Sequence, residues 1–377
     1  MDERATNLPA ITIRRMHDAE EGSARALAGR AFPPLGNFSF SPPPHTLLAE
    51  QDGRLIGAVV PEIFELPGKR WDEDRRGGVM LWLMTDPEAR GSGVGRHLVE
   101  AALRFFEERG CQEVFACVEG FNTSSSNLFA SHGFKILSLG EQLRRYGLFG
   151  TSLLWFRTYR FGGDVGHFLW ARPGATRPDR PALQWWVGTL VNALIFLLAG
   201  WRGGWIAGFD PLTVLGGTAV IFTLFGLREV AMRLEAYGEG LSVRHRAWEA
   251  AFPLSFGVSL AFGFFLPAPG SAYPRGEAWR YRDLVPKLGP IAFVGTAAVL
   301  AFTWAAWALL TFGSPPTGVA VLWLRAAQAA GLQISLFEVL LPFSLFASFN
   351  GRRVWDWNRA AWLVLAIAAT GLLLVEA

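Results

Sequence analysis

The distribution of apolar residues divides the chain into two unlike parts. Up to Arg180, apolar positions form short stretches between charged residues, as in a water-soluble domain. From Leu183 onward they form long runs at 183–201, 211–227, 250–268, 288–312, 319–349 and 360–375. A helix that crosses a bilayer needs about 20 predominantly apolar residues. The pattern therefore predicts a polar N-terminal part followed by an α-helical, polytopic membrane domain.

Within the polar part, the spacing of apolar residues alternates between strand-like and helix-like periods. The expected elements, in chain order, are a strand at 11–16, a helix at 18–32, a hairpin at 46–63, a buried strand at 78–85, a helix after a glycine-rich loop, and a strand at 111–119. Asp52 and Gly53 are a typical two-residue hairpin turn. Two later apolar segments, 153–161 and 166–174, are candidates for additional strands. This order predicts an α/β domain with a mixed central sheet flanked by helices.

Composition supports the division and narrows the possible partners. Hydrophobic residues make up 51% of the chain and charged residues 18%, and tryptophans near the ends of the apolar runs suit a membrane interface. A formal charge of +3 does not favour a nucleic-acid groove. Seven arginines lie between Glu141 and Arg180, just before the first run, and indicate the cytoplasmic side. The polar N-terminus predicts no cleavable signal peptide, and we expect Cys111 and Cys117 to be reduced thiols.

A glycine-rich loop in the polar part is the first candidate for chemistry. It contains Arg90, Gly91, Ser92, Gly93, Val94, Gly95 and Arg96, and the predicted amphipathic helix begins within it. The free N–H groups and the positive dipole at a helix N-terminus bind anions, and glycine allows a phosphate to approach the backbone closely. Taken alone, the loop could equally be a structural turn.

A second stretch, residues 121–135, favours an anion site over a structural turn. It places Asn122, Ser125, Leu128, Phe129, Gly133 and Phe134 in a fixed order. Together with Arg90-x-x-Gly93-x-Gly95, this stretch resembles the GNAT family of acetyltransferases, over roughly residues 10–140. The resemblance implies that acetyl-CoA binds where the strand ending at Thr85 and the strand starting at Cys111 splay apart.

The resemblance also assigns roles to individual residues. Backbone N–H groups from Gly91 to Arg96 would hold the pyrophosphate, and Asn122 and Phe129 would complete the cofactor site. A backbone N–H near Met84 or Thr85 would polarise the thioester carbonyl, as in an oxyanion hole. An amine would then attack directly, without an acyl-enzyme.

One departure from the family pattern bears on catalysis. The second motif commonly carries a tyrosine that protonates the leaving thiolate, and Phe129 cannot donate a proton. Water or Ser126 could substitute, turnover could be slow, or the domain could bind CoA without catalysis. Glu62 is a candidate general base at a strand end, against the simpler interpretation of a solvated carboxylate. We expect His97 and His132 to be surface helix residues.

Fragments of the apolar part, over about 183–375, resemble site-2-protease-like membrane metalloproteases. Arg228-Glu229-Val230-Ala231-Met232 stands at the place of the His-Glu-x-x-His helix. Leu288-Gly289-Pro290 opens a later span, and Asn350 stands before Gly351 at the place of an aspartate. If the resemblance holds, the metal ligands are lost, because zinc needs His, Cys or carboxylate ligands. The alternative is that Leu227 to Arg233 is an ordinary helix end. We expect no metal and no protease activity in either case.

The arginine-rich loops constrain the topology of this part. If all six runs crossed the bilayer, several of these loops would lie outside, against the positive-inside rule. Pro253, Gly257, Gly263 and Pro267 make 250–268 a poor straight helix. We therefore expect this run to enter and return on one side, which leaves five full spans.

These observations combine into one expected organisation: a GNAT domain at 1–145, a basic juxtamembrane linker at 146–182, and a protease-like membrane domain at 183–377. The expected function is a plasma-membrane-anchored N-acetyltransferase with its GNAT domain in the cytoplasm, using acetyl-CoA and an amine on a peptide, polyamine or lipid. The alternative is a non-catalytic acetyl-CoA-binding regulator on a pseudoprotease scaffold. The sequence does not identify the acceptor.

Overall fold

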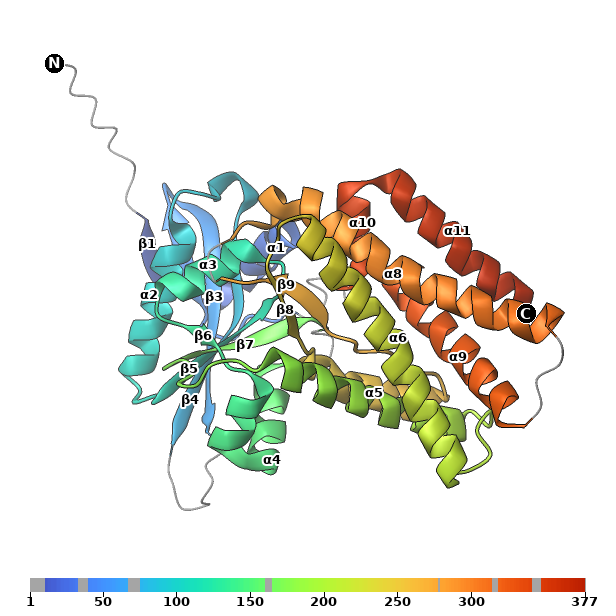
Figure 1. The fold of residues 1–377 in the computed structure, drawn as a ribbon. Helices are drawn as coiled ribbons and strands as arrows, with labels where there is room; N and C mark the ends of the chain where they lie inside the picture. Colours follow the sequence, from blue (N-terminus) through green and yellow to red (C-terminus); the bar gives the residue numbers. More distant parts are fainter. Residues whose placement is uncertain are drawn as a thin grey trace. The chain divides into compact units, whose positions relative to one another are not determined.

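The chain forms two compact units, which are described separately (Figure 1). The computed structural model describes residues 11–32, 40–66, 75–159, 165–276, 279–313, 318–340 and 347–376. The first unit comprises Met1–Val118, Ser125–Thr158 and Leu169–Arg177. The second comprises Glu119–Ser124, Tyr159–Phe168 and Pro178–Ala377.

The first unit is built on a mixed sheet, as the sequence predicts. Within the described residues, seven strands lie in the order β1-β2-β3-β4-β5-β7-β6. Their bounds are β1 Thr12–Arg15, β2 Leu47–Gln51, β3 Arg54–Glu65, β4 Arg76–Thr85, β5 Glu113–Glu119, β6 Lys135–Ile136 and β7 His167–Arg172. Strands β1 to β4 pair antiparallel, β4 and β5 pair parallel, and β6 and β7 pair antiparallel.

The hairpin between β2 and β3 confirms a local prediction. Gln51 pairs with Arg54, so Asp52 and Gly53 are the two turn residues. Both have positive φ, at 51° and 73°. This is the condition for a tight turn that matches the twist of the strands.

Four helices accompany the sheet: α1 Glu21–Ala31, α2 Val94–Glu107, α3 Thr123–Ser131 and α4 Leu139–Thr158. The buried face of α2 includes Leu98, Ala102 and Phe105, as its periodicity predicts. A Cβ at Gly78 of β4 would lie 2.4 Å from the ring of Phe106, so glycine lets α2 pack directly on the strand.

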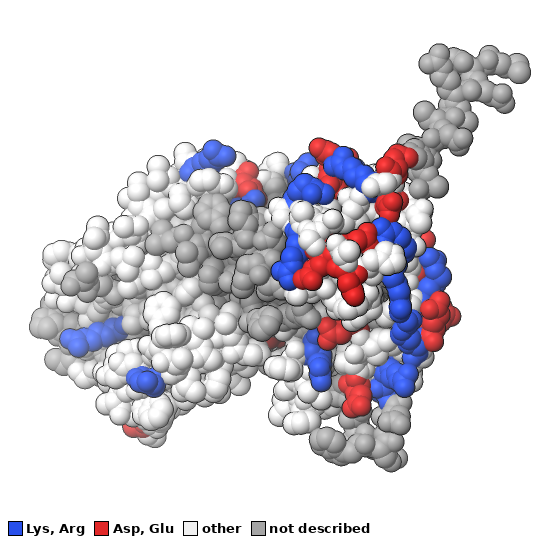
Figure 2. All heavy atoms as spheres, turned by 180° about the vertical axis from the view of Figure 1, so that it is seen from behind, with Lys and Arg blue, Asp and Glu red and all other residues white. Residues whose placement is uncertain are grey.

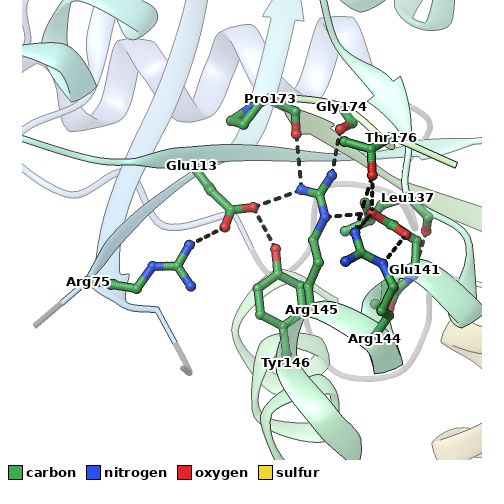
Figure 3. A network of polar contacts seen from close by, with 11 residues as sticks. Arg75, Glu113, Leu137, Glu141, Arg144, Arg145, Tyr146, Pro173, Gly174 and Thr176 are labelled. Carbon is green, nitrogen blue, oxygen red and sulfur yellow. Dashed lines mark hydrogen bonds and ion pairs between the residues drawn. The ribbon is translucent and has the colours of Figure 1, made fainter. Parts of the chain in front are cut away.

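Two buried carboxylates fix α4 and the segment after β7 to this sheet (Figure 3). Glu113 accepts hydrogen bonds from Arg75 at 2.6 Å, Arg145 at 3.2 Å and the Tyr146 hydroxyl at 2.6 Å. Glu141 accepts hydrogen bonds from Arg144 and, at 3.0 Å, from Arg145. The hydrogen bond from Arg144 lowers the pKa of Glu141 to about 2, although burial opposes the shift. Burial and the adjacent Glu113 carboxylate raise the pKa of Tyr146 well above its usual value.

The two segments proposed as additional strands have different structures. The 166–174 stretch forms β7 and extends the sheet, as predicted. The described part of 153–161 is instead helical to Thr158. In this part of α4 the buried residues Thr151, Leu154 and Thr158 recur at intervals of three and four, which is the period of a helix face and not of a strand.

The second unit is mainly helical. Its elements are α5 Pro181–Arg202, α6 Pro211–Gly238, α7 Phe252–Phe262, α8 Tyr281–Phe312, α9 Val319–Ser335, α10 Asn350–Trp357, α11 Arg359–Glu376 and the two-stranded sheet of β8 Val243–Arg246 with β9 Ser271–Pro274. A π-helical turn at Leu336–Leu340 continues α9. Figure 2 shows charged side chains dense over one part of the surface and sparse over another.

Four helices of the described chain are long and apolar enough to cross a membrane: Pro181–Arg202, Pro211–Gly238, Tyr281–Phe312 and Val319–Val339. Helices Glu249–Phe262 and Arg359–Val375 are shorter apolar helices. The fifth span that the apolar runs predict, at 360–375, corresponds to the shorter apolar helix Arg359–Val375.

The run at 250–268 is broken, as expected. Helix α7 has 11 residues, which at about 1.5 Å per residue span only about 16 Å of a hydrocarbon core of about 30 Å. The non-helical backbone after it is bonded by side chains. The Asn192 amide bonds both backbone groups of Ala268 at 2.8 and 2.9 Å, and Gln333 accepts from Phe265 N–H at 2.6 Å. Irregular backbone is tolerated at membrane depth only where protein satisfies it in this way.

Candidate functional site

The glycine-rich loop begins at a buried anchor, Asp86, at the end of β4. Asp86 is 1% exposed, accepts the Glu88 N–H at 3.1 Å, and pairs with Arg30 at 2.9 Å and Arg54 at 3.3 Å. Burial opposes ionisation of Asp86, but the Glu88 N–H and the Arg30 guanidinium outweigh it and lower its pKa. Asp86 is not among the site residues that the sequence pattern predicts. An aspartate before Pro87 is a capping signal that could have found it.

The loop presents backbone N–H groups at the start of α2. Gly91 and Gly93 have φ of +88° and +89°, a conformation that favours glycine. The first bond of the helix runs from His97 N–H to Gly93 C=O at 3.2 Å. The N–H groups of Val94, Gly95 and Arg96 precede it and therefore have no acceptor within the helix. This arrangement is an anion site of the predicted kind.

Side chains of the loop are used to hold it in place. The Ser92 hydroxyl donates to Ala89 C=O at 2.7 Å, and the Arg90 guanidinium donates to Ala31 C=O at 3.2 Å. The His97 ring lies 3.0 Å from Gly93 C=O. An anion here would therefore be bound chiefly by backbone N–H groups.

Beside the loop, β4 and β5 separate as expected. Their pairing runs from Gly77 with Glu113 to Met80 with Ala116. Strand β4 continues to Thr85 and β5 to Glu119. The pairing of β4 with β3 also shifts after Val60, whose partner is Trp82, to Pro61, whose partner is Met80. A bulge of this kind bends a strand and increases its twist, so the edge of β4 beyond Met80 is left without β5.

The loop, the end of β4 and helix α3 meet at Gly95. A Cβ there would lie 3.1 Å from the Leu128 side chain and 4.0 Å from the Thr85 hydroxyl. Met84, one residue earlier, is 2% exposed and packs in the core beneath α1. Because that side chain is buried, the backbone is the part of Met84 that a ligand could contact. The structure thus brings Gly95, Thr85 and Leu128 together.

The side chains of the other predicted site residues have different surroundings. Phe129 is 3% exposed and packs edge-on against Phe134 with ring centroids 5.2 Å apart. Asn122 is in the Glu119–Ser124 segment, which belongs to the second unit. Glu62 pairs with Val79, five residues before Met84 on β4. At about 3.4 Å per residue, this separates Glu62 from Met84 by about 17 Å along the strand.

In the second unit, the three positions that the sequence resemblance compares with metal ligands gather in one buried cluster. Arg228, Met232 and Asn350 are at most 1% exposed. The Asn350 amide nitrogen lies 3.9 Å from the Met232 sulfur and 3.1 Å from the Thr296 hydroxyl. Arg228 pairs with Glu338 at 2.9 Å, and Glu338 also accepts from Asn350 N–H at 3.2 Å. The carboxylate nearest this cluster is therefore engaged by a guanidinium.

The Glu229 carboxylate is also engaged by neighbouring side chains. It pairs with His245 at 2.9 Å and with Arg233 at 2.7 Å. The described residues contain no group of three or more His, Cys, Asp or Glu side chains that could hold a metal ion.

Comparison with known proteins matches this division of the chain. Residues 13–134 match the model of the acetyltransferase (GNAT) family. A mycothiol acetyltransferase of Amycolatopsis mediterranei is 34% identical over 87 residues, which cover 23% of this chain and 29% of that protein. The corresponding protein of Acidothermus cellulolyticus is 30% identical over 26% of this chain and 32% of its own length. The chain thus spans about a third of these relatives.

The C-terminal region has a different relative. A protein of Methanocaldococcus jannaschii, provisionally described as a zinc metalloprotease, is 28% identical over 160 residues, which are 42% of this chain and 75% of that protein. Among solved structures, an alanine N-acetyltransferase acting on a ribosomal protein of Escherichia coli is 18% identical, with a TM-score of 0.26 over 34% of this chain and 79% of its own.

The family match covers both halves of the motif pattern, the glycine-rich loop and the 121–134 stretch, and it ends before α4. The matched residues include β2 to β5 and helices α1 to α3, and strands β6 and β7 of the same sheet lie beyond them. Residues 13–134 therefore form a domain of the acetyltransferase (GNAT) family.

Proposed function

We propose that the chain is a membrane-anchored N-acetyltransferase that transfers an acetyl group from acetyl-CoA to an amine. The observation that carries the proposal is the glycine turn at the N-terminus of α2, beside the open edge of β4. There the N–H groups of Val94, Gly95 and Arg96 have no acceptor in their helix. The match of residues 13–134 to the GNAT family supports the reading of this anion site as a CoA site.

In this proposal, the N–H groups from Gly91 to Arg96 hold the pyrophosphate. The thioester lies along β4 near Met84 and Thr85, where a backbone N–H polarises its carbonyl. The amine nitrogen bonds to the carbonyl carbon, the C–S bond breaks, and the amine proton passes to water.

Phe129 supplies no proton to the leaving group. A thiol of ordinary pKa, about 8.5, leaves as thiolate near neutral pH and takes its proton from water. The acceptor class is a primary amine on a peptide, a polyamine or a lipid.

The membrane placement rests on the four long apolar helices and on the similarity of the C-terminal region to the M. jannaschii protein. We further propose that the GNAT domain lies on the cytoplasmic side of the plasma membrane, and the arginines before Pro181 support this orientation. In the cluster of Arg228, Met232 and Asn350, the Arg228–Glu338 ion pair stands where a protease would need ligands, so the membrane domain anchors the enzyme or binds its substrate and cleaves nothing.

Turnover tests the activity directly. The purified full-length chain is incubated with acetyl-CoA and a panel of peptide, polyamine and aminolipid acceptors, and release of free CoA thiol is followed. Acceptor-dependent thiol release is expected with at least one class. Release no faster than hydrolysis without acceptor, for every class, would contradict the enzymatic proposal.

A second candidate function is a non-catalytic CoA-responsive regulator built on a pseudoprotease scaffold. Two observations favour it: the buried Phe129 in place of a proton donor, and the ion pair at the metal positions. It predicts that acetyl-CoA binds without acceptor-dependent turnover.

A further inference from the structure

An exposed apolar face on α4 has no role in the proposed acetyl transfer. Gly147, with φ of +69° and ψ of −178°, interrupts α4 and sets off a C-terminal half, residues 148–158. The inner side of this half is buried in the first unit through Thr151, Leu154 and Thr158. The outer side is also apolar. Leu148 is 77% exposed, Phe149 65%, Leu153 37% and Phe156 79%.

These outer residues form one continuous surface on the helix. At about 100° per residue, positions 148, 149, 152, 153 and 156 fall within one half of the helix circumference. Ser152 is the single polar residue among them. Scattered exposed apolar residues are ordinary, but a contiguous group of two phenylalanines and two leucines marks an interaction surface.

The exposed charges in the sequence on either side of this surface are all positive. Arg157 is exposed and follows Leu153 by one helical turn, at the border of the apolar face. Between 141 and 180, every described charged residue that is exposed is an arginine, and the carboxylate on α4, Glu141, is buried in ion pairs with Arg144 and Arg145. Aromatic and leucine side chains bordered by arginine are the composition of a helix that lies in the interface of an anionic bilayer.

The position of this helix in the chain identifies the partner. The first membrane-capable helix starts at Pro181, within the same arginine-rich segment. Trp155 is half-buried, and its indole N–H donates to the Gln142 side chain at 2.6 Å, which ties the two halves of α4 together, while Thr151, Leu154 and Thr158 bury the inner face. A bilayer surface is thus available to a helix whose inner face is held rigidly.

We propose that the apolar face of residues 148–156 inserts into the cytoplasmic leaflet of an anionic lipid bilayer. The proposal rests on the proposed membrane placement of the chain. Phe149 and Phe156 lie among the acyl chains near the headgroups, and Arg157 meets lipid phosphates. The first unit is then held on the membrane surface by a contact separate from the spanning helices.

Fluorescence quenching in nanodiscs tests this contact on the full-length chain. Cys111 and Cys117 are replaced by alanine, and single cysteines are placed at Phe156 (F156C), at Leu194 (L194C) on α5 or at Glu107 (E107C) on α2. Each is labelled with an environment-sensitive dye in a bilayer containing anionic lipid. Leu194 is 55% exposed on a membrane-capable helix and is the positive control, and Glu107 is exposed in the first unit and is the negative control.

We expect brominated lipids to quench the labels at 156 and 194, and aqueous iodide to quench the label at 107 alone. If 194 is quenched by brominated lipid but 156 is quenched by iodide, or by neither agent because protein covers the face, the lipid contact is refuted while the membrane placement stands. If 194 is also reached only by iodide, the membrane placement itself fails. Because the substituted side chains are exposed, the fold should tolerate each label, and an unchanged unfolding temperature confirms this.

Discussion

At the scale of single residues, the sequence identified the loop glycines because their requirement is local. Gly91 and Gly93 take φ values that favour glycine. A glycine-rich stretch just before a predicted helix is enough to indicate that requirement. Glu62 and Phe129 were harder to interpret, because strand register and core packing decide what they contact. Register separates Glu62 from Met84 by about 17 Å along β4, and Phe129 packs against Phe134. The Arg228–Glu338 pair joins residues that are 110 positions apart, and no local sequence pattern indicates it.

Replacing Glu62 tests whether it is the general base. On the strand separation given above, Glu62→Gln should change kcat by no more than about twofold, because a base must reach the amine directly or through one water. Steady-state rates of thiol release check this across pH 6 to 9. A hundredfold fall in kcat, together with loss of the acidic limb of the pH–rate profile, would instead show that Glu62 is the general base.

Replacing Arg228 tests the buried ion pair. Arg228→Met leaves Glu338 charged and without its guanidinium in a buried site, which should cost about 3–5 kcal/mol of stability. The double replacement Arg228→Met with Glu338→Leu should recover most of that loss, because no buried charge then remains. Unfolding of the four members of this cycle in detergent measures the coupling. Additive effects of the two single changes would show that the pair is not coupled.

At the scale of elements, local signals predicted the hairpin, helix α2 and its loop, and the broken run at 250–268. Contacts between distant segments were not predictable in the same way. Arg75, Glu113, Tyr146 and Thr176 belong to separate stretches of sequence, and only the fold joins them around α4 (Figure 3). The separation of β4 from β5 was expected from the family resemblance, whereas its start after Met80 and the register shift opposite Pro61 were not.

The carboxylate network gives α4 a defined pH dependence. Hydrogen bonds from Arg144, with burial opposing them, lower the pKa of Glu141 from 4.5 to about 2. A depressed pKa contributes stability that is complete above the unfolded value and is lost as pH falls through the folded value. Stability should therefore decline between about pH 4.5 and 2 through this group. Glu141→Gln should be less stable than wild type at pH 7 and should flatten that decline, as thermal unfolding across pH would show.

At the scale of the whole molecule, the pattern of apolar runs predicted a polar α/β part and a helical, membrane-capable part. The assignment of individual spans was less secure, since hydropathy alone does not show where a helix bends back. Side-chain amides of Asn192 and Gln333 bond the backbone that follows α7, and these polar residues lie on two other helices. The sequence alone could not connect them to residues 265–268.

The broken run has a consequence for topology. If α7 returns to the side it came from, the loop at Arg275 is cytoplasmic and the turn at Gly313 lies outside. Single cysteines at these two exposed positions, in a chain without native cysteines, should react with an impermeant reagent from opposite sides of sealed vesicles. In the re-entrant arrangement, the cysteine at 275 is labelled only from the cytoplasmic side and the cysteine at 313 only from outside. Labelling of position 275 from outside would contradict it, because a full crossing of 250–268 would place that loop there.

The central claim is that the loop of Gly91 to Arg96 binds acetyl-CoA, and calorimetry with matched variants tests it most directly. Gly93→Asp places a carboxylate beside the proposed pyrophosphate. Gly110→Asp makes the same change at the other end of α2, where φ is also positive, at +69°, and a Cβ meets nothing within 4 Å. The wild-type chain and the Gly110 variant should bind acetyl-CoA alike. The Gly93 variant should bind acetyl-CoA about tenfold to a hundredfold more weakly, because losing a hydrogen bond to an ionised group costs about 1.5–3 kcal/mol. Equal affinity of all three proteins, or no heat from the wild type at millimolar acetyl-CoA, would contradict the account.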